Sequence, residues 1–136
     1  MNREHILLID DDEDDQYIFI EALKEVQASI HYSTAKNGYE AFEYLGEKHN
    51  MPSIIFLDLN MPLMNGFEFM EKIRNADEFH KIPIVVMTTS DSPVDKKRSY
   101  DLGALFFFTK TPDFKILKKI MEEILRKDFD AMHIAL

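Results

Sequence analysis

The chain has 136 residues, no cysteine and a formal net charge of -9 at pH 7. The absence of cysteine excludes disulfides, thiol catalysis and zinc sites built on cysteine. The acidic charge argues against sequence-independent nucleic-acid binding, which depends on Lys and Arg side chains that neutralise phosphates.

One domain and no membrane segment are expected from the length and the hydropathy pattern. A chain of this size can bury a real core. We expect residues 1–136 to form a single domain, with its core over residues 4–127 and a tail over residues 128–136. No apolar run approaches the length of a membrane span, and the N-terminus has no signal-peptide pattern, so we expect a soluble, cytoplasmic protein.

Five short apolar runs predict β-strands. A run that is almost wholly apolar is typical of a strand that is covered on both faces of a sheet. The second run is more polar than the others and therefore suits an edge strand. The five runs are Ile6–Ile9, Ile30–Ala35, Ile54–Leu57, Ile82–Met87 and Leu105–Phe108.

A helical pattern follows each predicted strand. The first helix begins after Asp12, which can cap it, and the second and third follow Asn37-Gly38 and Asn65-Gly66. The fourth, over residues 92–102, carries few apolar residues. The buried face of the first helix is predicted to hold Ile18, Ala22, Leu23 and Val26. The second is predicted to bury Ala41, Phe42 and Leu45, the third Phe67, Met70 and Ile73, and the fifth Phe114, Leu117, Met121, Ile124 and Leu125.

Carboxylates follow two of the predicted strands. The alternation of strands and helices is typical of a parallel α/β sheet, in which ligands bind outside the carboxyl ends of the strands. The acidic run 10–15 follows the first strand, and Asp58 follows the third. Carboxylates packed this closely repel one another and need a cation or another strong local reason. Because Mg²⁺ prefers oxygen ligands, Asp10, Asp11 and Asp58 predict a shared Mg²⁺ site.

Thr88 and Lys110 follow the fourth and fifth predicted strands and are expected at the same edge of the sheet. A hydroxyl and an ammonium beside a metal-bound carboxylate suit the arrival of a phosphoryl group on that carboxylate. An aspartate can accept such a group covalently. Taken alone, Thr88 is read more simply as a strand-end hydroxyl, and Lys110 as a surface lysine. The two residues indicate a phosphoryl site only when they are considered together.

These residues carry a resemblance to a known family. The chain resembles the receiver domain of bacterial response regulators, the CheY-like superfamily, over nearly its whole length. The matching stretches, in the family's order, are Leu7–Asp12, Phe56–Gly66, Pro83–Ser90, Leu102–Ala104 and Lys110. The pairs Thr88-Thr89 and Asp14-Asp15 further resemble the stand-alone regulators that partner phytochrome-type kinases. The resemblance implies a flavodoxin-like (CheY-like) fold, a doubly wound five-stranded parallel sheet with strand order 2-1-3-4-5.

The resemblance also implies a phosphoryl acceptor and its metal ligands. Asp58 would accept a phosphoryl group from a sensor histidine kinase or a phosphotransfer protein. Asp11, Asp58 and the main-chain carbonyl of Asn60 would bind Mg²⁺ directly, and Asp10 would act mostly through metal-bound water. The protein would then be a two-component signalling switch and not an enzyme.

The resemblance implies a switch as well. Thr88 would be the hydroxyl that moves toward the phosphoryl group, Lys110 would pair with that group, and Phe107 would be the aromatic residue whose rotamer follows activation. The fourth helix, fifth strand and fifth helix would form a face for an unidentified downstream protein. The apolar tail residues could extend the last helix, dock back on the domain or mediate a homodimer; they are Phe129, Met132, Ile134 and Leu136.

One stretch departs from the family pattern. The order Lys110-Thr111-Pro112 stands where the family has Lys-Pro with a cis peptide bond. A non-proline cis bond costs about 3 kcal/mol. The Lys110-Thr111 bond is therefore either trans, or cis and strained.

Two other interpretations remain open, and a third, an EF-hand, is disfavoured. A degenerate receiver would act as a phosphorylation-independent interaction module. A Mg²⁺-dependent phosphohydrolase would use Asp58 as nucleophile, but Asn60 stands where one such class has its general acid. An EF-hand would need a glycine at the sixth loop position, where Asp15 stands. The five histidines show no metal-ligand spacing and are read as surface or loop residues; they are His5, His31, His49, His80 and His133.

Overall fold

Five parallel strands alternate with five helices in the computed structural model, which describes residues 5–47 and 51–126. The strands form one sheet in the order β2-β1-β3-β4-β5, as the resemblance implied. The strands are β1 (His5–Ile9), β2 (His31–Ala35), β3 (Ile54–Asp58), β4 (Ile84–Thr88) and β5 (Phe106–Thr109). The helices are α1 (Glu13–Val26), α2 (Gly38–Gly46), α3 (Gly66–Arg74), α4 (Pro93–Asp101) and α5 (Phe114–Arg126). The predicted tail, residues 128–136, lies outside the described residues.

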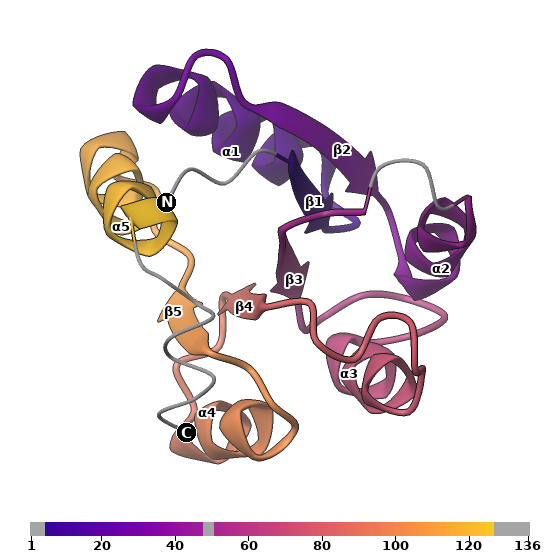
Figure 1. Cartoon of the computed structure of the whole chain (residues 1–136). Coiled ribbons are helices and arrows are strands. Elements are labelled where there is room, and N and C mark those ends of the chain that lie inside the picture. Colours follow the sequence, from indigo (N-terminus) through magenta and orange to yellow (C-terminus); the bar gives the residue numbers. More distant parts are fainter. Residues whose placement is uncertain (1–4, 48–50, 127–136) are drawn as a thin grey trace.

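Helices cover both faces of the sheet (Figure 1). Helices α1 and α5 pack against one face, and α2 and α3 pack against the other. The side chains of β5 show the alternation, because Phe106 and Phe108 contact the α1–α5 core whereas Phe107 contacts the other core. Strands β3 and β4 are buried along their whole length, while the edge strand β2 is mostly exposed, as its polar sequence predicted.

The strand register brings the carboxyl ends together at one edge of the sheet. Ile9 pairs with Leu57, Asp58 with Met87, and Thr88 with Thr109. The chain segments that leave these strands therefore begin side by side. This edge is where the sequence placed its candidate site.

Side-chain caps fix where the helices begin. The Asp12 carboxylate accepts hydrogen bonds from the main-chain N–H groups of Asp14 and Asp15, so the predicted cap of α1 is confirmed. Asn37 caps α2, and Asn65 caps α3 in a reciprocal capping box with Glu68. These caps explain why each of the first three helices starts where its polar residue stands.

The buried faces of α1 and α3 differ in part from the prediction. Ile18 was expected in the core but is exposed, whereas Phe19 and Ile20 are buried with Ala22 and Leu23. In α3, Phe69 is buried and Phe67 is only half-buried. Several apolar residues in a row satisfy more than one helical stripe, and the direction of packing selects one of them. The predicted burial of Leu117, Met121, Ile124 and Leu125 in α5 is confirmed.

Two further expectations are settled by the fold. His5 is not a loop residue but begins β1, where it is half-buried and its Nε2 atom lies 2.9 Å from the hydroxyl of Tyr44. No cis peptide bond occurs among the described residues, so the Lys110-Thr111 bond is trans. Within residues 5–47 and 51–126, no helix is long and apolar enough to cross a membrane.

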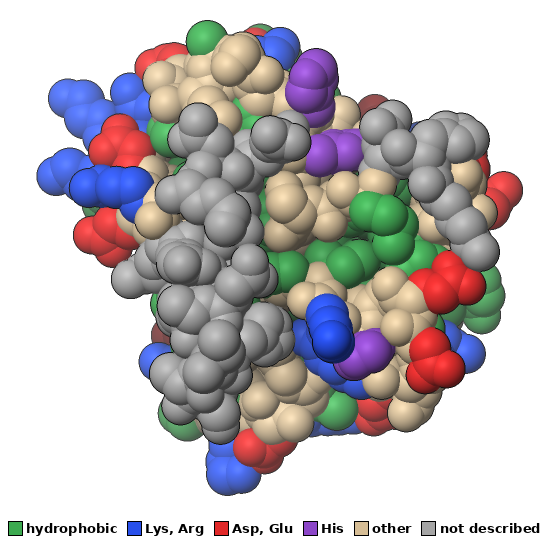
Figure 2. All heavy atoms as spheres, in the orientation of Figure 1, with side chains coloured by type: hydrophobic (Ala, Val, Ile, Leu, Met, Phe, Trp, Pro, Cys, Tyr) green, Lys and Arg blue, Asp and Glu red, His purple; other side chains and the backbone are tan. Residues whose placement is uncertain are grey.

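The charged surface is mixed in sign. On the face shown in Figure 2, Lys and Arg side chains of the described residues lie among Asp and Glu side chains and form no continuous basic area. Several charged side chains of the described residues are paired, as in the contact of Lys118 with Glu25 at 3.0 Å between α5 and α1. Exposed pairs of this kind add little to stability.

Candidate metal centre

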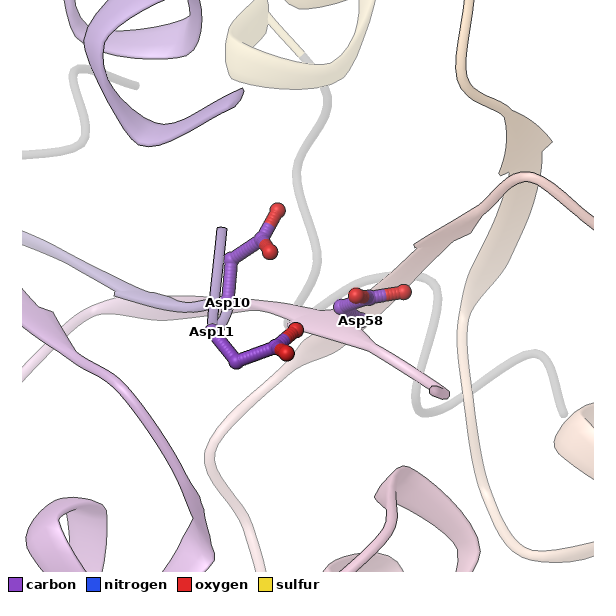
Figure 3. Close-up of side chains that lie close together, drawn as sticks. All are labelled: Asp10, Asp11 and Asp58. Carbon is purple, nitrogen blue, oxygen red and sulfur yellow. The ribbon is translucent and has the colours of Figure 1, made fainter. Parts of the chain in front are cut away.

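Three carboxylates lie together at the carboxyl edge of the sheet. Asp10 and Asp11 follow β1, and Asp58 is the last residue of β3 (Figure 3). One oxygen from each side chain lies within 4.8 Å of the others. Asp10 and Asp58 are buried, with 0% and 5% of their surface exposed, whereas Asp11 is open to solvent. The sequence-predicted trio is therefore brought together by the fold.

Short-range hydrogen bonds hold the turn that carries Asp10 and Asp11. The main-chain N–H of Asp10 donates to the carbonyl of Ala35 at 3.0 Å, which continues the β1–β2 ladder by one residue. The Asp10 side chain accepts a hydrogen bond from the N–H of Asp12 at 3.0 Å. From α1, the Gln16 amide donates to the Asp10 carbonyl. The direction of the Asp10 carboxylate is thus set by hydrogen bonds to the main chain.

Lys110 brings a positive charge into this group. Its Nζ atom lies 2.8 Å from Asp10 Oδ2, 2.8 Å from Asp15 Oδ2 and 3.4 Å from Asp58 Oδ2. The main-chain N–H of Lys110 donates to the carbonyl of Thr88 at 2.7 Å, so the loop after β5 stays attached to β4. The Lys110-Thr111-Pro112 sequence therefore places the lysine at the site with a trans peptide bond.

The charges perturb one another in opposite directions. Burial raises the pKa of Asp58 to about 6, and the negative charge of Asp10 adds to this effect although Lys110 opposes it. Burial also raises the pKa of Asp10. For Lys110 burial alone would lower the pKa, but the carboxylates of Asp10, Asp15 and Asp58 more than reverse this and the pKa is raised. One ammonium thus faces several carboxylates in a poorly solvated place.

This arrangement fits a divalent cation. The buried oxygens of Asp58 and Asp10 disfavour a negative charge even beside Lys110, which is the situation that a bound cation relieves. Asp11 contributes an oxygen from the solvent side, which leaves room for metal-bound water. Carboxylate oxygens with water are the ligands that hard cations such as Mg²⁺ prefer.

Thr88 and Asn60 complete the group around Asp58. Thr88 is fully buried, and its Oγ1 atom accepts hydrogen bonds from the Asn60 side-chain amide at 3.4 Å and from the N–H of Ser90 at 3.3 Å. The N–H of Asn60 donates to Asp58 Oδ1 at 3.4 Å. Phe107 lies farther along, opposite Val86 in the β4–β5 register, and is half-buried in the second core.

Two side chains at this site have roles that the sequence did not reveal. Asp15 pairs with Lys110, and Gln16 holds the Asp10 carbonyl. A signal for Asp15 does exist, because it stands four residues before Phe19 and seven before Ala22, on the buried stripe of α1. A carboxylate on an apolar stripe indicates a specific partner.

Comparisons with known proteins agree with this geometry. The family model for the response regulator receiver domain matches residues 6–132. The response regulator Rcp1 of Synechocystis sp. is 33% identical over 124 residues, which are 88% of this chain and 84% of Rcp1. The response regulator Rre1 of the same organism is 29% identical over 121 residues, and the chain spans 52% of that longer protein.

Solved structures lead to the same assignment. The crystal structure of the phosphorylated cyanobacterial phytochrome response regulator RcpA matches with a TM-score of 0.81 and 31% identity, over 90% of this chain and 91% of RcpA. The Mn²⁺-bound form of Rcp1 matches with a TM-score of 0.80 and 30% identity, over 92% of this chain and 96% of that one. The predicted resemblance to phytochrome-associated regulators is thereby confirmed. The chain belongs to the response regulator receiver domain family.

Proposed function

We propose that the protein is a phosphorylation-dependent switch in which Asp58 accepts a phosphoryl group from a histidine kinase or a phosphotransfer protein. Members of the receiver family work with such donors in two-component signalling and bind divalent metal. The observation that carries the assignment of the acceptor is the position of Asp58. It is buried at the end of β3, among the carboxylates of Asp10 and Asp11 and 3.4 Å from the ammonium of Lys110.

The proposed chemistry is nucleophilic transfer. An oxygen of ionised Asp58 forms the new bond to phosphorus, and the bond from phosphorus to the donor breaks. With acetyl phosphate as donor, acetate leaves with the electron pair and no proton needs to move. The pKa of about 6 leaves Asp58 mainly ionised at neutral pH.

The site residues have separate tasks in this proposal. Mg²⁺ held by Asp10, Asp11, Asp58 and the main-chain carbonyl of Asn60 would neutralise charge on the phosphoryl oxygens. Lys110 supplies a second positive charge from the loop after β5. Thr88 accepts its hydrogen bond from the Asn60 amide at 3.4 Å, so its own hydroxyl proton can be donated to a phosphoryl oxygen.

The proposed output face is formed by α4, β5 and α5. Helix α4 buries only Ser99 among its residues, and Val94 and Tyr100 are exposed. A helix with so few buried contacts can change position at low cost in free energy, as a switching element requires. Phe107 is a half-buried residue of β5 within this face and stands two residues before Thr109, which pairs with Thr88 in the strand register, so we assign it the coupling role. The partner there is a downstream protein or a second copy of the chain, and the compartment is the cytoplasm.

Intact-mass analysis after incubation with acetyl phosphate tests this function. We expect one phosphoryl adduct that requires Mg²⁺ and is absent from Asp58→Asn. The matched control is Asp14→Asn, which changes the same charge on an exposed side chain of α1 and is expected to label like the wild type. Labelling of Asp58→Asn at the wild-type level would contradict the assignment of Asp58.

A negative result would be informative as well. A wild-type protein that takes no phosphoryl group and binds no beryllofluoride would be the degenerate interaction module instead. Steady turnover of a phosphate ester such as p-nitrophenyl phosphate, abolished in Asp58→Asn, would support the phosphohydrolase.

A further inference from the structure

Asp15 contacts Lys110 although it is not one of the three carboxylates of the candidate metal centre, which include the proposed acceptor Asp58. It lies in the first turn of α1, and its Oδ2 atom accepts a hydrogen bond from Lys110 Nζ at 2.8 Å. Its side chain is 39% exposed, compared with 0% for Asp10. The contact to Asp15 is as short as the contact to Asp10 and shorter than the 3.4 Å contact to Asp58.

The ammonium of Lys110 is therefore divided among three carboxylates. A lysine has three N–H donors and no more. The two short contacts of Lys110 go to Asp10 and Asp15, and the long contact is the one to Asp58. A phosphoryl group that arrives at Asp58 needs this same ammonium, so it must compete with the partners that already hold it.

Of the two carboxylates that hold Lys110 at 2.8 Å, Asp15 is the one outside the candidate metal centre. Asp10 belongs to the candidate metal centre, where a bound cation would neutralise its negative charge. Asp15 lies outside that trio and keeps its charge for Lys110. Its carboxylate also repels the negative charge of an approaching phosphoryl group.

The surroundings allow Lys110 to change partner. Asp15 and Lys110 both line a cavity of about 270 Å³ whose other walls are mainly apolar. The walls are supplied in part by Ile18, Phe108 and Leu117. The cavity is partly open to solvent, and the Lys110 side chain borders it, so its end has space to move.

We propose that Asp15 is a positioning residue that retains part of the Lys110 ammonium and thereby limits the affinity of the site for a phosphoryl group. This inference rests on the proposed function of Asp58. Asp15 keeps Lys110 beside the site when no phosphoryl group is bound, and it weakens the phosphorylated state by the same contact. Neutralising Asp15 frees the ammonium for Asp58 and removes one repulsive charge.

Beryllofluoride, which mimics a phosphoryl group on an aspartate, provides the test. Its dissociation constant is measured by calorimetry at saturating Mg²⁺ for the wild type, Asp15→Asn and Asp14→Asn. We expect Asp15→Asn to bind about threefold to tenfold more tightly, the effect of one partly screened charge near the ligand. Asp14→Asn removes the same charge one position away, from an exposed carboxylate that is not one of the three in contact with Lys110. It is expected to change the constant by less than about twofold.

Two more variants separate the contact from the fold. Asp15→Glu keeps a carboxylate within reach of Lys110 and is expected to restore an affinity close to that of the wild type. Asp15→Ala, compared with Asp14→Ala, repeats the test without an amide that could form new hydrogen bonds. In both comparisons we expect tighter binding when the carboxylate at position 15 is lost, whereas the loss of a purely structural support would weaken binding.

The beryllofluoride titrations can contradict either the role of Asp15 or the proposed function of Asp58. Weaker or unchanged binding by Asp15→Asn would mean that Asp15 only supports the lysine, and the inference would be wrong. Equal tightening in Asp14→Asn and Asp15→Asn would assign the effect to net charge and also overturn it. A wild-type protein that binds no beryllofluoride would overturn the proposed function, and the inference with it.

Discussion

Lys110 and Asp10 lie 100 positions apart in the chain, and the Nζ atom of Lys110 donates to Asp10 Oδ2 at 2.8 Å. Asp10 follows β1 and Lys110 follows β5, and the sheet order places β3 and β4 between these two strands. The long lysine side chain therefore spans the carboxyl ends of the central strands. It closes one side of the site above Asp58, which ends β3.

The crowding of charge at this place predicts a stability gain for Asp58→Asn in the absence of metal. A carboxylate whose folded-state pKa is about 6, above its ordinary value near 3.8, is less favourable when ionised in the folded than in the unfolded chain. We expect Asp58→Asn to raise the free energy of unfolding at pH 7 by about 1–3 kcal/mol. Urea titration in EDTA measures this, with Asp14→Asn as the control.

The gain should shrink as the pH is lowered. A raised folded-state pKa means that the wild type loses its penalty between pH 7 and pH 4, where Asp58 takes up a proton. The two unfolding curves should therefore approach one another toward pH 4. A lower stability of Asp58→Asn than of the wild type at pH 7 would show that the contact with Lys110 outweighs desolvation.

Gly66 should not tolerate a side chain, because it supports the loop after Asp58. A Cβ atom there would lie 2.7 Å from the Asp58 carbonyl oxygen and 2.8 Å from Leu59 Cα, both of which are backbone atoms. We expect Gly66→Ala to destabilise the fold by about 2–4 kcal/mol and to lower phosphoryl uptake by Asp58. Thermal unfolding and mass analysis would measure the two effects.

Gly46 supplies the matched control for Gly66. It ends α2, and a Cβ atom added there meets nothing within 4 Å. We expect Gly46→Ala to be neutral or to stabilise the fold by up to about 1 kcal/mol, because alanine favours helix more than glycine does. Equal losses in the two variants would show that the close approach at Gly66 is not what limits substitution.

His5 should make the fold sensitive to mild acid. Burial lowers the pKa of His5 below 6.5, and the neighbouring His31 on β2 lowers it further. The unfolded chain then binds a proton at His5 more readily than the folded chain, so stability is lost as the pH falls below 6.5. His5→Gln should flatten this part of the pH profile in urea titrations. An unchanged slope in His5→Gln, or an equal change in the exposed His80→Gln, would contradict this origin.

The sequence by itself determined the order of the elements, and it predicted the acceptor chemistry that we propose for Asp58. Strands covered on both faces must be apolar, so the runs at Ile54–Leu57 and Ile82–Met87 were recognisable from composition alone, with β4 starting two residues later than predicted. The caps at Asp12 and Asn65 are local, which is why the starts of α1 and α3 could be predicted. The family pattern supplied the strand order, since alternation alone does not specify which strands are neighbours.

The tertiary structure decided what depends on distant contacts. The exposure of Ile18 and the burial of Phe19 follow from how α1 packs on the sheet, which helical spacing leaves open. The partnership of Asp15 with Lys110 joins α1 to the loop after β5, and the half-buried His5 depends on Tyr44 from α2. A local pattern encodes neighbours along the chain, whereas ion pairs and buried polar groups are fixed only when separate elements meet.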